Sequence, residues 1–295
     1  MTRILLTGKT GQLGSEMLHA LAPLGEVIAP GRNQLDLTDP ASICKTIREC
    51  APDIIVNTAG YTTVDQAEKE RELAHQINAL APGVIAEEAK KIGALMMHYS
   101  TDYVYDGSKG AFYDEEDTPN PLNYYGKSKL DGERAVIATG CAHLILRASW
   151  IYSAHRANFV LTMLRLARER KELSVVDDQV GSPTWAKSLA QSSVEILTRI
   201  QEPRSLSGIY HLSAAGHTTR FDFAKLIIEV ARQVFPADTP WAEIHPTTTA
   251  KYPLPAERPL NVATCKAKIK RDFGVTLTSW QEQIERFIRT LPVTP

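Results

Sequence analysis

The stretch Arg3–Gly14, "RILLTGKTGQLG", decides the fold. It opens with a short apolar run, which predicts a buried strand. Gly8, Gly11 and Gly14 follow at intervals of three residues, directly before a segment whose leucines and methionine recur at helical spacing. Strand, glycine turn and helix in this order are typical of the first unit of a dinucleotide-binding fold. There the glycines let the backbone approach a pyrophosphate at the helix N-terminus.

The glycine turn differs from two related patterns. Its spacing departs from G-x-G-x-x-G, and Lys9 lies inside it rather than in a terminal G-K-[ST], so it is not a P-loop. Taken alone, the glycines also fit a tight connection without a ligand. Their position at the start of a strand–helix–strand unit favours the nucleotide site. The cofactor contacts expected in this turn are Gly8, Gly11, Gln12, Leu13 and Gly14.

The rest of the first half alternates apolar runs with helical patterns. Strands that are apolar throughout are buried on both faces, and alternation with helices indicates a parallel sheet covered on two sides. The sequence therefore predicts an α/β protein with a Rossmann-type doubly wound parallel sheet. The expected strands are 26–32, 53–60, the opening of 94–105, and 143–149, and the expected helices are 39–50, with Asp39 as N-cap, and about 74–91.

The second half is less regular. An amphipathic helix is expected at 158–170, a strand and turn at 208–216, and a final helix at 279–291. We expect residues 1–150 to form the dinucleotide-binding domain, joined by 158–180 and other later segments. Residues 151–295 would then form mainly a smaller, mostly C-terminal α/β substrate-binding domain, with interleaved boundaries.

The composition of the chain argues against several classes of function. The chain has 295 residues, with 33 basic and 34 acidic side chains and a formal net charge of -1. This balance argues against a general nucleic-acid binder, which needs a basic excess. No apolar run is long enough to suggest a signal peptide or membrane span. The four cysteines are scattered without a C-x-x-C pair, so no metal ligands are predicted. A cytoplasmic protein fits these features.

The second strand bears on the choice of dinucleotide. It ends in "APGR" and offers Arg32 but no acidic residue. An arginine here accommodates the 2′-phosphate of NADP, whereas an acid selects NAD. Asp36 follows in the run "LDL" and is placed to face the adenine. We expect NADPH, with NADH as a second cofactor, and a solvated surface role for Arg32 remains the alternative.

The run "NYYGKSK", Asn123–Lys129, suggests a proton donor. Tyr125 and Lys129 are four residues apart, so a helix places them on one face. Tyr124 is five residues before Lys129 and would point elsewhere. A nearby ammonium lowers a tyrosine pKa, which makes Tyr125 the candidate acid. A lone Y-x-x-x-K is common by chance, and a plain helix surface is the alternative.

A second polar run, "HYSTDYVY", follows the fourth expected strand. Ligands in such folds bind beyond the carboxyl ends of the strands. Ser100, Thr101 and Asp102 lie at that end, and a hydroxyl there could bind a substrate carbonyl or the tyrosine oxygen. The alternative is a turn or a helix cap that closes the strand.

These residues resemble the extended short-chain dehydrogenase/reductases, and more closely the dTDP-4-dehydrorhamnose reductase family. The resemblance covers essentially the whole chain. It rests on the runs "GKTGQLG", "LDLTD", "VNTAGYTTVDQAE", "HYSTDYVYDG", "YGKSKLDGE", "RASWIY", "DDQVGSPT" and "YPLPAERP". The last three are more specific than the first.

The resemblance implies site residues and a reaction. It implies NADPH-dependent reduction of the C4 keto group of dTDP-4-dehydro-L-rhamnose to dTDP-L-rhamnose, the last step of dTDP-rhamnose synthesis. Tyr125 would be the proton donor, with Lys129 and Thr101 completing the catalytic set. The expected cofactor contacts beyond the glycine turn are Arg32, Asp36, Leu37, Ala59, Gly60, Thr62, Tyr99, Tyr125 and Lys129. The expected contacts to the nucleotide-sugar are Thr101, Asp102, Trp150, Val64 and Asp65.

Other functions compete with this interpretation. A 4,6-dehydratase would show T-D-E after the strand, whereas this chain has Thr101-Asp102-Tyr103. A 4-epimerase or another nucleotide-sugar reductase differs from the favoured reductase only in the late motifs "QVGSPT" and "PAERP". A non-catalytic regulatory subunit of the same superfamily is disfavoured by the intact tyrosine, lysine and hydroxyl set. Magnesium use and a homodimer stay open.

Four further side chains are candidate functional groups. His98 and His211 lie in strand patterns, which favours hydrogen-bonded core histidines. His217 lies in a turn, where it could touch a substrate phosphate. Arg258 is the better candidate for the diphosphate, because a guanidinium matches phosphate geometry. Its alternative is a solvated loop arginine.

Overall fold

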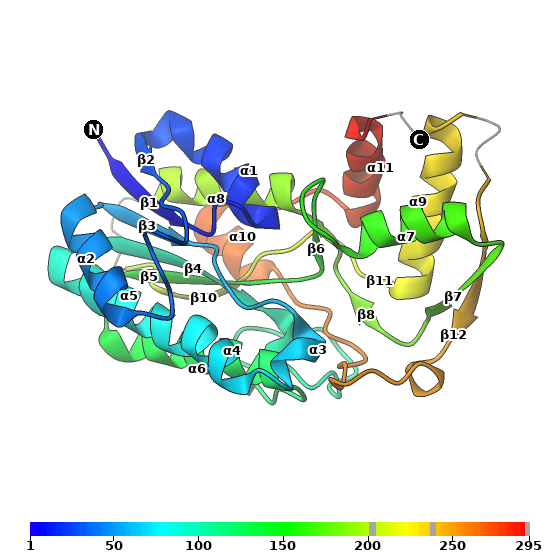
Figure 1. The fold of residues 1–295 in the computed structure, drawn as a ribbon, viewed down its shortest axis with the longest axis horizontal. Helices are drawn as coiled ribbons and strands as arrows, with labels where there is room; N and C mark the ends of the chain where they lie inside the picture. Colours follow the sequence, from blue (N-terminus) through cyan, green and yellow to red (C-terminus); the bar gives the residue numbers. More distant parts are fainter. Residues whose placement is uncertain (201–204, 237–239, 293–295) are drawn as a thin grey trace.

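Six parallel strands form the central sheet of the computed structural model, which describes residues 1–200, 205–236 and 240–292 (Figure 1). Their order across the sheet is β10-β5-β4-β3-β1-β2. Every neighbouring pair is parallel, so the predicted α/β, Rossmann-type doubly wound sheet is confirmed. The strands are β1 (Arg3–Thr7), β2 (Glu26–Ile28), β3 (Ile54–Asn57), β4 (Leu95–Thr101), β5 (His143–Ala148) and β10 (Gly208–His211).

The strand register aligns the carboxyl ends of the sheet. Thr7 pairs with Asn57, Asn57 with His98, and Thr101 with Ala148. All seven residues of β4 are buried, as expected for a strand covered on both faces. The loops that follow β1, β3, β4 and β5 therefore open on the same edge of the sheet, where such folds bind their ligands.

Two layers of helices cover the sheet. One apolar core joins it to α1 (Gln12–Leu21), α8 (Ala186–Arg199) and α10 (Ala267–Phe273). The other joins it to α2 (Pro40–Cys50), α5 (Ala81–Ile92) and α6 (Tyr124–Thr139). The predicted N-cap of α2 is confirmed, since Asp39 accepts a hydrogen bond from the backbone N–H of Ala41 at 2.9 Å. Short turns complete this part of the chain: 3-10 helices at Ala22–Leu24 and Asp102–Val104, and α3 (Val64–Ala67).

Two expected elements differ from the structure. The second strand stops at Ile28 rather than Arg32, and the "APGR" run becomes a loop. The helix expected at 74–91 is made of α4 (Arg71–His75), a π-helical turn (Gln76–Leu80) and α5. The π turn carries the Asn78 amide, which binds both backbone groups of Tyr61 at 2.8 and 2.9 Å. A π turn often marks a functional site, and this one fixes the loop after β3.

A second, smaller part lies beside the carboxyl edge of the sheet (Figure 1). Its apolar core is formed by α7 (Phe159–Glu169), β7 (Glu172–Val176), α9 (Arg220–Val234), β12 (Glu243–Thr247) and α11 (Trp280–Thr290). β7 and β12 form a parallel pair. The remaining short elements are β6 (Ile151–Tyr152), β8 (Val180–Gly181), β9 (Thr184–Trp185), β11 (Thr218–Thr219) and a 3-10 turn (Thr249–Lys251).

The chain passes between the two parts more than once. After β7, α8 packs against α1 and β10 joins the large sheet, before α9 returns to the smaller core. We propose the predicted division into a dinucleotide-binding domain and a smaller substrate-binding domain on the basis of these two cores. Residues 201–204, 237–239 and 293–295 of the predicted second domain lie outside the described residues.

Candidate active site

A pocket of about 690 Å³ opens at the carboxyl edge of the sheet, with walls from both parts of the chain. Its volume is in the range of cofactor and small-molecule sites. The sequence-predicted site residues that line it are Gly8, Gly11, Gln12, Leu13, Arg32, Asp36, Leu37, Ala59, Gly60, Thr62, Val64, Tyr99, Thr101, Asp102, Tyr125, Lys129 and Trp150. Gly14, Asp65 and Arg258 were predicted as well but do not line it.

Two of the three glycines in the turn that borders the pocket have no room for a Cβ atom. Gly8 has φ +77°, a left-handed conformation that favours glycine. A Cβ atom on Gly14 would lie 2.0 Å from the carbonyl oxygen of Gly8. Gly14 therefore acts by close packing of the turn on α1, and the backbone at Gly8 and Gly11 is left bare toward the pocket. This cradle fits a dinucleotide pyrophosphate.

The loop after β2 borders the same end. The ammonium of Lys9 donates a hydrogen bond to the carbonyl of Ala29 at 2.6 Å and ties the turn to this loop. Arg32 is exposed at the pocket wall. Asp36 accepts hydrogen bonds from the backbone N–H and the hydroxyl of Thr38, and the backbone bond is the main reason its pKa is lowered. Asp36 is thus an ionised residue that shapes the loop.

Helix α6 carries the tyrosine and lysine. Asn123 caps it by accepting a hydrogen bond from the N–H of Gly126 at 2.8 Å, so the helix begins just before Tyr125. Lys129 is buried and donates to the carbonyl of Tyr99 at 2.5 Å. Burial lowers the pKa of Lys129 to about 8. Tyr124 is outside the pocket lining, and the Arg71 guanidinium lies 5.2 Å from its ring centroid.

Burial, rather than the charge of Lys129, has the largest effect on the pKa of Tyr125. Burial raises the pKa of Tyr125 well above its usual range, and a hydrogen bond with Thr101 acts in the opposite direction. The ammonium of Lys129 is instead held by the Tyr99 carbonyl. The prediction of a lowered Tyr125 pKa is therefore wrong, because desolvation of the phenolate is the largest influence on it. Tyr125 retains its proton at neutral pH.

Thr101 and Asp102 meet at the end of β4. The Thr101 hydroxyl donates to the Asp102 carboxylate at 3.2 Å and accepts from the N–H of Tyr103. The Ser149 hydroxyl donates to the other Asp102 oxygen at 2.5 Å. Burial raises the pKa of Asp102 to about 6. Thr101 is also the N-cap of the following 3-10 turn, so the structural alternative for this hydroxyl holds alongside its place in the pocket.

Asp65 and Arg258 bind one another. The Arg258 guanidinium donates to the Asp65 carboxylate at 2.8 Å and to the carbonyl of Ala256 at 2.6 Å. Asp65 also accepts from the N–H of Ala256. The pair ties the "PAERP" segment to α3, behind Val64 in the pocket wall. Direct contact of either side chain with the nucleotide-sugar stays a prediction.

Several pocket residues were not found from the sequence. One group comes from the smaller part, where its members follow no motif: Tyr152, Arg156, Ala157, Asn158, Phe159, Arg220 and Phe223. The Nε of Arg156 donates to the carbonyl of Thr10 at 3.0 Å, which joins the smaller part to the glycine turn. Thr58 also lines the pocket, and its hydroxyl donates to the carbonyl of Thr7 at 2.6 Å.

The two strand histidines are core residues. His98 is fully buried, and its Nδ1 lies 3.0 Å from the Asn57 amide nitrogen. His211 is fully buried beside the hydroxyl of Tyr105 and the carbonyl of Cys265, at 2.8 and 3.0 Å. Burial lowers the pKa of His211 to about 3, so it is neutral. His217 is exposed and outside the pocket lining, with its ring against Phe112.

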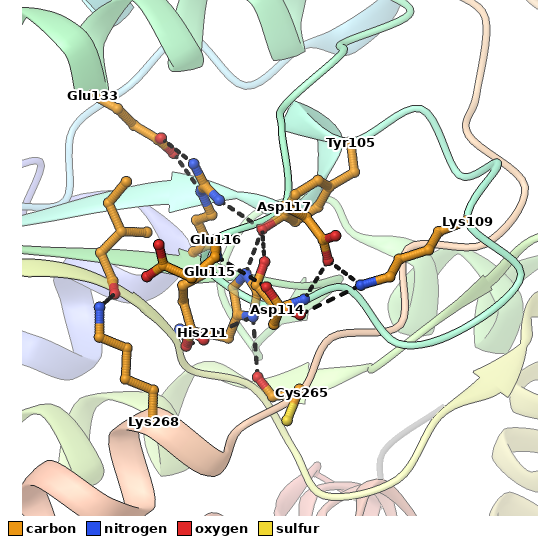
Figure 2. A network of polar contacts seen from close by, with 12 residues as sticks. Tyr105, Lys109, Asp114, Glu115, Glu116, Asp117, Glu133, His211, Cys265 and Lys268 are labelled. Atoms are coloured by element: carbon orange, nitrogen blue, oxygen red, sulfur yellow. Dashed lines mark hydrogen bonds and ion pairs between the residues drawn. The ribbon is translucent and has the colours of Figure 1, made fainter.

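A buried polar network lies around His211. Figure 2 shows Glu133, Tyr105 and His211 close to the acidic residues 114–117, in the loop that follows β4 and its 3-10 turn. The Arg147 guanidinium joins Glu133 through two hydrogen bonds, at 2.9 and 2.6 Å, and donates to the Tyr105 hydroxyl. Ser100, the residue before Thr101, donates to Glu133 at 2.5 Å. This network connects β4, β5 and α6 and reaches the pocket wall at Ser100.

Two kinds of feature are absent from residues 1–200, 205–236 and 240–292. No helix in these described ranges is long and apolar enough to cross a membrane. Within the same ranges, no cluster of three or more histidine, cysteine, aspartate or glutamate side chains is arranged to hold a metal ion.

The fold and the pocket define an NAD(P)-binding protein of the extended short-chain dehydrogenase/reductase type. A parallel sheet with a glycine turn after β1, and a tyrosine and lysine one helical turn apart, meet in a single pocket. The chain belongs to the family described as "RmlD substrate binding domain", whose model matches residues 1–293.

Named relatives agree with this family. The chain is 42% identical over 297 residues to dTDP-4-dehydrorhamnose reductase from Escherichia coli K12, an alignment that covers 99% of this chain and 98% of the relative. It is 41% identical to the reductase of the same name from Burkholderia thailandensis, with 98% and 99% covered. The crystal structure of dTDP-4-dehydrorhamnose reductase from Bacillus anthracis in complex with NADP superposes with a TM-score of 0.89, at 36% identity over 97% of this chain and 99% of that one.

More distant structures share the fold. A UDP-glucose 4-epimerase from Thermus thermophilus, in complex with NAD, superposes with a TM-score of 0.78 at 18% identity, over 97% of this chain and 98% of that one. At this identity the likeness supports the predicted architecture and carries no information on the reaction.

Proposed function

We propose that this chain reduces the C4 keto group of dTDP-4-dehydro-L-rhamnose, with NADPH as the cofactor, to give dTDP-L-rhamnose. One observation carries the proposal. Tyr125, Lys129 and the Thr101 hydroxyl line one end of a pocket whose other end is the bare glycine turn. Dinucleotide and proton donor would therefore share one cavity. The reductases to which the chain is about 40% identical over nearly its whole length support the choice of substrate.

The dinucleotide would lie between the glycine turn and α6. The bare backbone at Gly8 and Gly11 would face its pyrophosphate, and Arg32 would accept the 2′-phosphate that distinguishes NADPH from NADH. Lys129 would hold the ribose next to the nicotinamide. When bound, the cofactor supplies the hydride, and the protein supplies position and electrostatics.

The residues at the other end of the pocket would donate a proton to the substrate and position the groups involved. Tyr125 keeps its proton at neutral pH because burial raises its pKa, and it donates that proton to the O4 oxygen as negative charge develops there. Thr101 orients the carbonyl with its hydroxyl. Lys129, with a pKa of about 8, is charged at neutral pH, and its charge favours the phenolate that Tyr125 becomes.

The other predicted properties follow the same proposal. We propose that a nucleotide-sugar is the small-molecule partner and that the protein acts in the cytoplasm. We further propose that NADH serves as a second cofactor, since Arg32 is exposed and its contribution is separate from the pyrophosphate cradle. A homodimer and a requirement for magnesium are settled by measuring mass in solution and activity in the presence of a chelator.

The test is NADPH oxidation by the purified protein with enzymatically prepared dTDP-4-dehydro-L-rhamnose. The decisive variant is Tyr125→Phe, and its matched control is Tyr124→Phe on the same helix, outside the pocket lining. We expect turnover in the wild type and the control, and a fall of at least about 100-fold in Tyr125→Phe. Equal rates in all three proteins would remove Tyr125 as the donor. Tight NADPH binding without turnover would instead point to another nucleotide-sugar or to a non-catalytic protein.

A further inference from the structure

Arg220 enters the pocket from the smaller part of the chain. It is the first residue of α9, it is partly buried, and it lines the pocket opposite the end of β4. Its guanidinium carbon lies 3.5 Å from the centroid of the Trp150 ring and 5.0 Å from that of Phe159. The guanidinium is therefore placed against one aromatic wall of the cavity.

The position of the Trp150 ring is itself constrained. Trp150 has φ +43°, an uncommon left-handed conformation for a bulky residue. The ring also packs closely against Gly181, where an added Cβ would lie 2.4 Å from the indole carbon Cε2. Gly181 and Arg220 together hold the indole, and stacking limits the orientation of the guanidinium.

The polar partners of Arg220 leave most of its donors unused. A guanidinium has five N–H donors, and a hydrogen bond with the Tyr103 side chain occupies one direction. No carboxylate among the described residues lies within ion-pair distance of Arg220. Asp102 acts on it electrostatically, but that carboxylate is bound by Thr101 and Ser149.

Three other cations that line the pocket are bound by protein oxygens: Lys9 donates to the carbonyl of Ala29, Lys129 to that of Tyr99 and Arg156 to that of Thr10. Arg32 lies exposed in the loop after β2, and Arg258, outside the lining, is paired with Asp65. Burial lowers the pKa of Arg220, and the charge of Arg258 acts on it in the same direction. A desolvated guanidinium next to a second one is unfavourable unless an anion neutralises them.

We propose that Arg220 binds the diphosphate of the nucleotide-sugar substrate. This inference rests on the proposed function, because that substrate brings a diphosphate into the pocket on the side away from the glycine turn. Arg220 is placed to take the role predicted for Arg258, which instead holds Asp65. The planar guanidinium can donate two hydrogen bonds to phosphate oxygens at the same time. Stacking on Trp150 orders the guanidinium before the substrate binds, which lowers the entropic cost of binding.

The test measures binding of dTDP and of thymidine by calorimetry in the presence of saturating NADPH. The variants are Arg220→Met, which keeps an apolar contact with Trp150, and Arg220→Lys, which keeps the charge but loses the fork. The control is Arg165→Met, an exposed α7 arginine that is paired with Glu169. We expect dTDP affinity to fall at least tenfold in Arg220→Met and less in Arg220→Lys. Thymidine and NADPH affinities should stay within about twofold of the wild type in every variant.

The inference can be overturned by binding data from either Arg220 variant. Unchanged dTDP affinity in Arg220→Met, or an equal loss of dTDP and thymidine affinity, would show that Arg220 does not act on the phosphates. Should Arg220→Met not fold, the dTDP-to-thymidine affinity ratio in Arg220→Lys decides, and a ratio equal to that of the wild type overturns the inference. Failure of the proposed function looks different, since the wild type itself would then bind no dTDP and show no turnover.

Discussion

The buried ion pair of Glu133 and Arg147 allows a quantitative prediction. Both side chains are 1% exposed, and they share two hydrogen bonds, at 2.6 and 2.9 Å. Glu133 also accepts from the Ser100 hydroxyl at 2.5 Å. The change Glu133→Gln keeps the size of the side chain but removes its charge, so it leaves the Arg147 guanidinium buried without a carboxylate.

The expected loss follows from the cost of an unpaired buried charge. Removing one partner of such a pair costs about 3–5 kcal/mol in free energy of unfolding. The entropy of unfolding is about 2.1 cal/mol/K per residue, which for 295 residues is roughly 0.6 kcal/mol/K. The melting temperature should therefore fall by about 5–8 °C, toward the lower end because Arg147 retains its hydrogen bond to Tyr105.

The assay is calorimetric melting of three variants beside the wild type. Glu87→Gln changes an exposed acid on α5 and should leave the melting temperature within about 1 °C. The double change Glu133→Leu with Arg147→Met removes both charges and should recover most of the loss, because two apolar side chains need no partner. A fall of less than about 2 °C in Glu133→Gln, or a double variant less stable than the single one, would refute the reasoning.

Three further predictions follow from the pocket itself. Gly14→Ala should weaken NADPH binding at least tenfold by fluorescence titration, because the new Cβ would lie 2.0 Å from the Gly8 oxygen and shift the turn; unchanged affinity would contradict the cradle. Arg32→Gln should raise KM for NADPH several-fold but not KM for NADH in steady-state assays, and equal effects on both would rule out a 2′-phosphate contact. Burial raises the pKa of Asp102 to about 6, so between about pH 4 and 6 the folded chain holds a proton that the unfolded chain releases. Stability from this group should therefore fall as pH rises through that window, by up to roughly 3 kcal/mol, and urea melts of Asp102→Asn should lack that slope.

Local patterns in the sequence were sufficient for the large sheet. The apolar strands β1, β3, β4 and β5, the glycine turn and the cap of α2 all depend on residues within about a dozen positions of one another. Side-chain periodicity and glycine sterics act at that range. Thr101, Tyr125 and Lys129 were found in the same way, because the carboxyl ends of parallel strands form the ligand-binding edge of such a sheet.

The smaller part was harder to predict, since its packing joins distant segments. β7 pairs with β12, about seventy residues later, and neither strand was expected from the sequence. The residues between them cross into the large sheet as β10 and back as α9. Pairing of distant strands depends on which apolar faces remain uncovered after the local elements form. The spacing of apolar residues along the chain does not contain this information.

Charge partners show the same division between sequence and structure. The sequence alone established the residue types at the pocket and the order of strands and helices, because these depend on local sterics and periodicity. Only the tertiary structure decided what each charge faces: Arg258 binds Asp65, Lys129 binds a backbone carbonyl, and Arg220 lies open in the pocket on Trp150. Burial likewise moved the pKa of Tyr125 upward where the sequence had suggested a lowering. Electrostatic energies depend on distance and desolvation in three dimensions, which spacing along the chain does not contain.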